Sequence, residues 1–437
     1  MSLEGRWEHL GIRHVALAAA LLSAATTAPS IANSFAGDDR WVVVERPLLR
    51  APPSLRAVAT EPYWPAGFGG VMWRPAVLAS YALDYRVSSD PRWFHVTNVL
   101  WAVAAAAALA VLAALVAGRA AGLVAGLLFA VHPVHVEATA ALAGRAELMA
   151  ATGYATALLC AIRAEDARRY LWGVVAASAL AITSKEHAAT LPAAVLVVAA
   201  GRALAAGADW RASIRRALPA AAAGAVPIAL YVPLRAEILP GTLAAGGITP
   251  GLEGLGLLER AWAMLPLSLE WWRLLLFPAH LSADYAPAEL VPTTGFTLGH
   301  VLAAGVWAGA GWLAWRLRRR VPAVALGLVW SGVTLLPVSN LLVPTEFLVA
   351  ERTLFLPSWG VAVALGGLWA AWRAPAAARN GVLAAVLAAG ALRSVIRTPV
   401  WRDDDRLFQS VVRDAPRSYR TLWNQGRDEF AAGRMGS

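Results

Sequence analysis

Residues 94–117 read FHVTNVLWAVAAAAALAVLAALVA, and this stretch decides the class of fold. A membrane-spanning α-helix needs about 20 consecutive, mostly apolar residues. After a few polar side chains at its start, the stretch supplies that length almost entirely with alanine, leucine and valine. It therefore predicts a helix that crosses a membrane.

Similar apolar runs recur along nearly the whole chain. The 437 residues are 58% hydrophobic and 15% charged, with a mean hydropathy of +0.55, which excludes an ordinary soluble globular domain. We therefore expect an all-α polytopic membrane protein with about eleven transmembrane helices. The expected spans are residues 11–30, 94–117, 120–136, 140–162, 170–184, 187–204, 215–234, 298–316, 321–342, 353–372 and 378–397. The first run also fits a signal peptide, but the polar segment after it would have to stay tethered to work with the bundle.

Basic residues mark alternate loops between these spans and do not form one soluble patch. They cluster at residues 163–169, 202–216, 316–320 and 373–379. By the positive-inside rule these loops and the N-terminus are cytoplasmic. Because the net charge of +10 arises in this way, we expect no nucleic-acid partner.

The remaining loops then face outward, and two of them are long, at residues 31–93 and 235–297. Loops of this length in a compact domain are usually functional or disordered. Their mixture of aromatic, apolar and polar residues favours interfacial helices that rest on the membrane over disorder. Residues 263–279 (AMLPLSLEWWRLLLFPA) could span, but a span here would put the next basic loop outside. Because Glu270 and Arg273 lie in its middle, we expect this segment along the outer surface and the C-terminal tail outside as well.

The chain divides into a membrane domain, residues 1–397, and an outward tail, residues 398–437. Cys160 is the only cysteine, so the fold has no internal disulfide. Packing must therefore hold the outward loops in place.

Residues 129–147 read FAVHPVHVEATAALAGRAE and bring many ionisable groups into an otherwise apolar chain. In the expected orientation, His132, His135 and Glu137 lie at the outer end of one span. Arg145 and Glu147 begin the next span on the same side. A charged side chain at membrane depth costs about 2.5–3.5 kcal/mol on insertion scales, so such groups usually face a polar cavity and pair with one another.

Other charged residues are expected at the same outer level. They are Asp38, Asp39 and Arg74 in the first long loop, Lys185 and Glu186 between the fifth and sixth spans, and Glu346, Glu351 and Arg352 between the ninth and tenth. We infer one shared cavity that opens outward. A carboxylate there can deprotonate an acceptor hydroxyl, while the cations stabilise an anionic leaving group such as a lipid phosphate. The residue types alone fit a transporter or a polymer ligase equally well.

A series of motifs across residues 31–430 narrows this choice. They are GDDR at 37–40, WRPAV at 73–77, FHVTNVL at 94–100, LLFAVHPVHVEA at 127–138, GRAEL at 144–148, SKEH at 184–187, LLLFPAHLSADY at 274–285 and AERTLFLPSWG at 350–360. In this order they resemble the GT-C membrane glycosyltransferases. Within that superfamily the chain is similar to the transmembrane and tetratricopeptide-repeat proteins, which are protein O-mannosyltransferases of animals with bacterial relatives. The family usually has Tyr-Arg-Pro where this chain has Trp-Arg-Pro.

The resemblance implies a GT-C fold and an inverting transfer from a polyprenyl-phosphate sugar, with mannose as the expected sugar, to a Ser/Thr hydroxyl of a protein. It implies that a first-loop acid is the base, and we expect Asp39 first and Asp38 second. Arg74, His132, His135, Glu137, Arg145, Glu147, Lys185, Glu186, Glu351 and Arg352 are the candidates for binding the donor phosphate and sugar. The expected location is a bacterial inner membrane, with the active site on the periplasmic side.

Other functions stay open at this point. A GT-C enzyme can instead transfer its sugar to a glycan or a lipid, and the chain could be a non-catalytic scaffold or a transporter. A transporter would be expected to show repeated halves with broken helices at the midplane, and the sequence has no such repeat. A scaffold would tolerate loss of the first-loop carboxylates.

The tail departs from the family pattern. DAPRSYRTLWNQGRDEFAAGRMGS, at residues 414–437, looks like the opening of one tetratricopeptide repeat. Since at least three repeats are normally needed for a stable solenoid, we expect a truncated repeat that forms none. Either the chain is a fragment, or acceptor recognition is reduced or supplied by another protein.

Several candidate residues also have simpler interpretations. The histidines with Glu137 could suggest zinc, but Pro133 interrupts the helix and the spaced Cys/His set of a structural site is missing, so we predict no metal ligands. A requirement for a divalent cation is left open. Asp38 and Asp39 could form a solvated turn, and Arg74 could only anchor an interfacial helix. Lys185–Glu186 and Glu351–Arg352 could each be a local ion pair.

Overall fold

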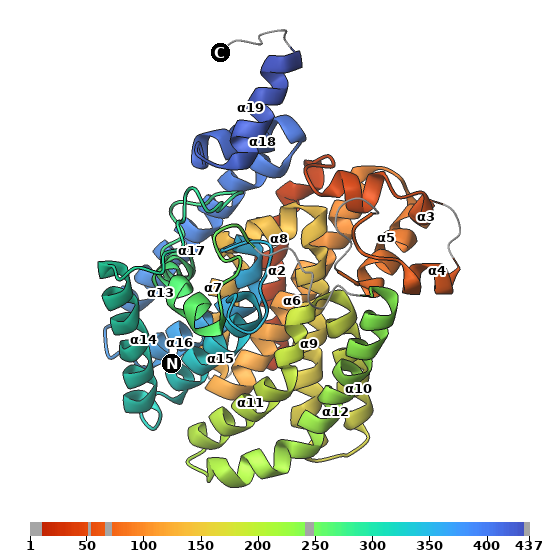
Figure 1. Cartoon of the computed structure of the whole chain (residues 1–437). Coiled ribbons are helices and arrows are strands. Elements are labelled where there is room, and N and C mark those ends of the chain that lie inside the picture. The colour runs from red at the N-terminus through yellow and green to blue at the C-terminus, as the bar shows by residue number, and fades with distance from the viewer. Residues whose placement is uncertain (1–10, 51–53, 66–71, 241–248, 432–437) are drawn as a thin grey trace.

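The computed structural model describes residues 11–50, 54–65, 72–240 and 249–431, and every regular element within these ranges is a helix (Figure 1). Long helices form the body of the molecule. Two helices near the C-terminus, α18 (Asp404–Asp414) and α19 (Tyr419–Ala431), stand at one end of the bundle. The all-α fold predicted from the apolar runs is confirmed for the described residues.

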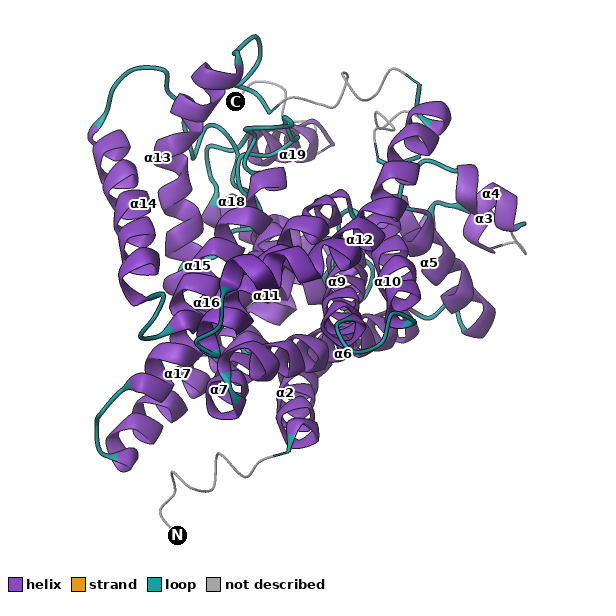
Figure 2. Ribbon diagram, turned by 90° about the horizontal axis from the view of Figure 1, so that it is seen from below, coloured by secondary structure: helices purple, strands orange, loops and turns teal. Residues whose placement is uncertain are grey.

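One helix lies on each apolar run, and a further helix, α13, lies between two of the runs. The helices of the bundle are α2 (Ile12–Thr27), α6 (Pro91–Ala117), α7 (Arg119–Ala130), α9 (Arg145–Ala164), α10 (Tyr170–Ser184), α11 (Leu191–Ala205), α12 (Trp210–Ile238), α13 (Leu257–Leu276), α14 (Leu298–Leu317), α15 (Pro322–Leu335), α16 (Phe355–Ala371) and α17 (Ala376–Arg397). A view along the bundle shows α13 and α14 side by side at its edge (Figure 2).

The start of α6 shows how local sequence sets a helix boundary. Asp90 is the N-cap, and its carboxylate accepts a hydrogen bond of 2.9 Å from the backbone N–H of Arg92. Pro91 occupies the first turn, where its missing N–H costs nothing and its fixed φ favours the helix. The long apolar run that follows then continues as one helix to Ala117.

Small residues allow the central helices to approach closely. A Cβ atom on Gly327 of α15 would lie 2.1 Å from the carbonyl oxygen of Gly360 in α16. A Cβ atom on Gly366 of α16 would lie 2.4 Å from the carbonyl oxygen of Ala121 in α7. Glycine and alanine at such crossings provide the close van der Waals contact that holds helices together in a membrane. The outer polar loops therefore rest on a tightly packed base.

Six described helices are long and apolar enough to cross a membrane. A bent pair, residues 119–130 with 133–140, makes a seventh if it counts as one span, and α10 and α15 are shorter apolar helices. The chain is thus an integral membrane protein. The predicted count of eleven spans and the interfacial position of α13 stay predictions.

The predicted span at residues 120–136 is wrong as a continuous helix. The helix α7 ends at Ala130, and the following elements, η3 (Pro133–His135) and α8 (Val136–Ala140), turn away by 51°. The cause is Pro133, which disfavours helical geometry in the residue before it, and His132 has extended backbone. This break separates Glu137, on α8, from the apolar helix α7.

The first long loop, residues 31–93, contains short helices, and their position at an outer membrane interface stays a prediction. They are the π-helical turn η2 (Arg40–Val44), α3 (Pro47–Arg50), α4 (Leu55–Thr60) and α5 (Pro75–Val87). Figure 1 shows α3, α4 and α5 on one side of the bundle, at the end that also carries α18 and α19. A polar site can therefore form between this loop and the C-terminal segment.

Candidate active site

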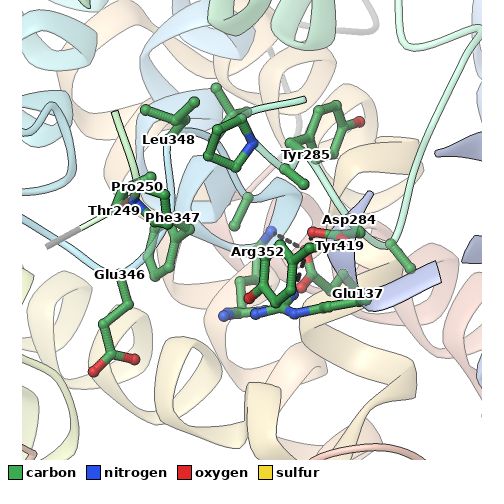
Figure 3. Close-up of a pocket in the computed structure, with 16 residues that line it drawn as sticks. Glu137, Thr249, Pro250, Asp284, Tyr285, Glu346, Phe347, Leu348, Arg352 and Tyr419 are labelled. Carbon is green, nitrogen blue, oxygen red and sulfur yellow. Dashed lines mark hydrogen bonds and ion pairs between the residues drawn. The ribbon is translucent and has the colours of Figure 1, made fainter. Parts of the chain in front are cut away.

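A cavity of about 610 Å³ lies between the first outer loop, α8, the loop after α13 and the C-terminal segment. Its charged lining includes Asp38, Glu137, Asp284, Arg352 and Arg420, and its apolar lining includes Trp41, Trp401, Leu407 and Phe408. A smaller adjoining pocket shares Glu137, Asp284, Arg352 and Arg420, and adds Tyr285, Glu346 and Tyr419 (Figure 3). Charged groups from distant parts of the chain thus meet in one polar space.

Glu137 and Arg352 form the central ion pair of this cavity. Glu137, on α8, is buried, and one of its carboxylate oxygens accepts a hydrogen bond of 2.8 Å from the backbone N–H of Arg352. Its other oxygen accepts from the Arg352 guanidinium, so the carboxylate binds main chain and side chain together. The Arg352 side chain is still 31% exposed. It is a fixed cation with N–H groups left for a ligand.

The two first-loop aspartates differ in their surroundings. Asp38 is exposed and lines the cavity, whereas Asp39 is 1% exposed. The Asp39 carboxylate accepts hydrogen bonds from the backbone N–H groups of Ala143 at 2.8 Å and Ala36 at 3.3 Å. Burial raises the pKa of Asp39 to about 7, although these hydrogen bonds oppose the rise. Asp39 therefore holds the first loop against Ala143, and Asp38 lines the cavity.

Gly37 sets the direction of this turn. Its φ is +57°, a left-handed conformation that glycine adopts without a steric penalty. The carbonyl of Asp38 then accepts from the backbone N–H groups of Trp41 and Val42, which begins the turn η2. The Gly-Asp-Asp sequence therefore sends one carboxylate outward and the next one inward.

Arg145 lies in a buried network away from the cavity lining. Its side chain is 0% exposed and pairs with Asp84 of α5 at 2.5 Å. Its other N–H groups donate to Asn98 Oδ1, Ser80 Oγ, Phe94 O and Thr97 Oγ1. A guanidinium has five N–H donors, and all are engaged here. Arg145 thus fixes α5 against α6 and has no donor left for a phosphate.

A second buried cluster joins α9, α10 and the first loop. Lys185 contacts the carboxylate of Glu147, and the second oxygen of that carboxylate lies 3.3 Å from His187 Nδ1. Glu186 accepts from Arg74 at 2.8 Å and from the Tyr231 hydroxyl at 3.4 Å. The interpretation of Lys185 and Glu186 as a local ion pair is therefore wrong, because Lys185 pairs with Glu147 and Glu186 pairs with Arg74.

The local ion pair between Glu351 and Arg352 is also wrong. Glu351 is fully buried and accepts from the backbone N–H of Ser282 at 2.7 Å and the Tyr285 hydroxyl at 2.9 Å. The guanidinium of Arg397 lies 3.9 Å from the same carboxylate oxygen. Glu351 and Arg352 therefore point in different directions. Glu351 binds the loop after α13, whereas Arg352 lines the cavity.

His132 and His135, in the motif LLFAVHPVHVEA, are not among the residues that line the cavity or its adjoining pocket. His135 lies 2.7 Å from Ser358 Oγ and packs against the rings of Phe129 and Phe355, which also contact each other. His132 Nε2 lies 3.0 Å from the carbonyl oxygen of Leu275, which joins the bent helix to α13. Within the described ranges no three His, Cys, Asp or Glu side chains are grouped as metal ligands. These contacts match the structural hydrogen-bond interpretation of the histidines.

Asp284 and Arg420 are among the cavity-lining residues that sequence reasoning missed. Asp284 lies in the motif LLLFPAHLSADY, and Arg420 lies in the tail. Figure 3 shows Asp284 beside Arg352, Glu137 and Tyr419, with Glu346 directed away from them. A buried carboxylate needs a charged or hydrogen-bonding partner, and this rule alone could have indicated Asp284 as a site residue. No sequence pattern indicated that Arg420 would meet it.

The described fold and this cavity together define an all-α integral membrane protein with a charged cavity at one end of its bundle. The family model described as dolichyl-phosphate-mannose-protein mannosyltransferase matches residues 86–235. Protein O-mannosyl-transferase TMTC3 of Mus musculus is 23% identical over 97% of this chain and 49% of its own length. Protein O-mannosyl-transferase TMTC4 of Homo sapiens is 25% identical over 92% of this chain and 62% of its own length.

Shorter matches have higher identity. Protein O-mannosyl-transferase TMTC1 of Mus musculus is 32% identical over 34% of this chain and 17% of its own length. The chain spans 47–62% of the length of the curated relatives that match most of it. These findings confirm the resemblance drawn from the motifs: the chain is a homologue of the TMTC-like protein O-mannosyl-transferases.

Proposed function

We propose that this protein transfers mannose from a polyprenyl-phosphate donor to a Ser/Thr hydroxyl of a protein on the outer side of the membrane. The observation that carries the proposal is the cavity in which Asp38 and Arg352 line the same space. The names of the matched family and relatives, with their mannosyltransferase activity, support the sugar and the protein acceptor. An integral membrane setting supports a donor whose chain lies in lipid.

In the proposed reaction Asp38 is the general base. It accepts the proton of the acceptor hydroxyl as the hydroxyl oxygen attacks the anomeric carbon of the sugar. The bond between that carbon and the phosphate oxygen breaks, and the polyprenyl phosphate leaves with the electron pair. Because attack and departure occur on opposite faces, the configuration of the sugar inverts. A positioned carboxylate contributes roughly 10²–10⁴-fold in such a step.

Arg352 is proposed to bind the leaving phosphate. Glu137 holds its main chain and side chain in place, so the cation is already oriented before the donor binds. An oriented guanidinium stabilises the negative charge that develops on the phosphate as the bond breaks. A base and a cation that line one cavity support the proposal of an inverting transfer from a phosphate-linked donor.

The expected order of the aspartates changes on geometric grounds. The sequence prediction placed Asp39 first, but the Asp39 carboxylate is buried and bound to backbone N–H groups. Asp38 lines the cavity and is therefore the preferred base. We propose that Asp39 positions the loop that carries Asp38, and that both lie on the periplasmic side of a bacterial inner membrane.

The proposal is tested with labelled polyprenyl-phosphate mannose and membranes that contain the full chain. Wild type is expected to move label into protein, and Asp38→Asn is expected to lose at least about a hundredfold of that rate. Asp166→Asn, which changes an exposed aspartate between α9 and α10, is the matched control and is expected to retain activity. The anomeric configuration of the product, read by NMR, should be opposite to that of the donor. Retention of configuration, or full activity of Asp38→Asn, would overturn the mechanism.

A further inference from the structure

The C-terminal segment is fastened to both outer loops. The backbone N–H of Gly37 donates to Asp404 at 2.7 Å, which joins the first loop to α18. The backbone N–H of Arg417 donates to Glu289 at 2.7 Å, and the hydroxyl of Ser418 donates to Asp284. These contacts join the loop after α13 to the start of α19. The segment therefore forms one wall of the cavity.

Arg420 is the charged side chain that α19 brings to this wall. Its Nη1 lies 3.2 Å from Asp284 Oδ1, and its side chain is 54% exposed. Asp284 is buried and also accepts from Ser418, so it fixes both the segment and the guanidinium. A second cation is thus held in the cavity by a buried carboxylate.

Arg420 and Arg352 have matching arrangements. Each guanidinium pairs with one buried carboxylate, Asp284 for Arg420 and Glu137 for Arg352. Both side chains remain partly exposed, and both line the larger cavity and the smaller adjoining pocket. The two arginines come from separate elements, α19 and η7 (Glu351–Leu354). Neither carboxylate uses all five N–H donors of its arginine.

Two guanidinium groups in one cavity favour an anion with several acceptor oxygens. Arginine matches phosphate because its planar group donates two parallel hydrogen bonds, and charge-assisted bonds of this kind are about twice as strong as neutral ones. Glu137 and Asp284 already pair with the arginines, so they hold the cations in place and leave their outer N–H groups for the ligand. A phosphate that bridges the two arginines would touch both the core and the tail.

We propose that Arg352 and Arg420 form a two-armed clamp for the phosphate of the lipid-linked donor, so that the C-terminal segment contributes a substrate-binding residue. This inference rests on the proposed function, because it takes its ligand class from the donor. It also gives the segment a role in donor binding in addition to any role in acceptor recognition.

Binding of labelled polyprenyl phosphate to the purified full chain tests the clamp without a need for turnover. Arg420→Gln removes the cation with little loss of length and is expected to weaken binding at least about tenfold. Arg417→Gln is the matched control, because it removes the same charge three residues away. Arg417 is 69% exposed and binds Glu289 also through its backbone, so less than a twofold change is expected. Equal binding by wild type and Arg420→Gln would overturn the clamp.

Further measurements separate the clamp from folding and from the proposed function. Thermal unfolding of Arg420→Gln should match wild type, and Arg420→Lys should restore part of the binding because it keeps the charge without the planar group. Unlabelled polyprenyl phosphate should displace the label and inorganic phosphate should not; equal displacement by both would overturn the lipid-phosphate assignment.

If polyprenyl phosphate binds through Arg420 but no mannose is transferred, the clamp stands and the proposed function fails. If mannose is transferred equally well by Arg420→Gln, the clamp alone fails.

Discussion

Arg352 and Glu137 are 215 residues apart in the sequence, yet the backbone N–H and the guanidinium of Arg352 both donate to the Glu137 carboxylate. This contact joins α8, which follows the Pro133 break, to η7 before α16. A carboxylate that binds both main chain and side chain fixes the orientation of the cation and its position together. The cavity therefore has a preset cation in the same lining as the exposed Asp38.

Loss of the Glu137 carboxylate should weaken donor binding. Glu137→Gln keeps the side-chain shape but removes the charge that holds the Arg352 guanidinium, and charge-assisted hydrogen bonds are worth about 1.5–3 kcal/mol. We expect KM for polyprenyl-phosphate mannose to rise about tenfold or more. Glu165→Gln changes a glutamate just after α9 that pairs with Arg202 in the last turn of α11, so it should leave KM unchanged. An unchanged KM in Glu137→Gln would show that Arg352 does not depend on this anchor.

Arg145 should be required for folding and not for donor affinity. Its guanidinium is buried, with every N–H donor engaged around Asp84. Removal of one partner from a buried ion pair typically costs about 3–5 kcal/mol. We expect Arg145→Leu to unfold or to lower the melting temperature strongly in detergent, whereas Arg168→Leu, in an exposed loop, should not. A stable Arg145→Leu protein with a raised donor KM would instead make Arg145 a ligand-binding residue.

Asp39 should make stability depend on pH. Burial raises its pKa from 3.8 to about 7 in the folded protein. Between these values the folded state keeps the proton that the unfolded state has lost, so stability falls as pH rises through this window and levels off above about pH 7. Asp39→Asn cannot ionise and should lose this part of the slope. The change in melting temperature between about pH 5 and about pH 8 measures this slope in wild type and in Asp39→Asn. An equal change in both proteins would refute the raised pKa of the buried Asp39.

Much of the architecture is predictable because apolar length is a local property of the sequence. Helices such as α6 and α12 lie on the runs that predicted them. The gathering of charges at one end was also predictable, because ionisable groups at membrane depth require partners. The Pro133 break was visible in the sequence, but its 51° bend was not.

The pairing of these charges was not predictable, because it depends on how the helices pack. Composition cannot distinguish Arg145, which is fully buried, from Arg352, which faces the cavity. Adjacent aspartates look equivalent in GDDR until the turn at Gly37 separates them. The position of Arg420 depends on the docking of α19 on Asp284, a contact between segments 136 residues apart.

The most direct measurement of the central claim is kcat for purified Asp38→Asn and Asp39→Asn with polyprenyl-phosphate mannose, each variant checked for folding by thermal unfolding. We expect Asp38→Asn to fold like wild type and to lose at least about a hundredfold in kcat, because the base is gone. We expect a smaller loss of kcat for Asp39→Asn, together with its altered stability profile. Full turnover by Asp38→Asn with loss confined to Asp39→Asn would instead make the buried Asp39 carboxylate the base.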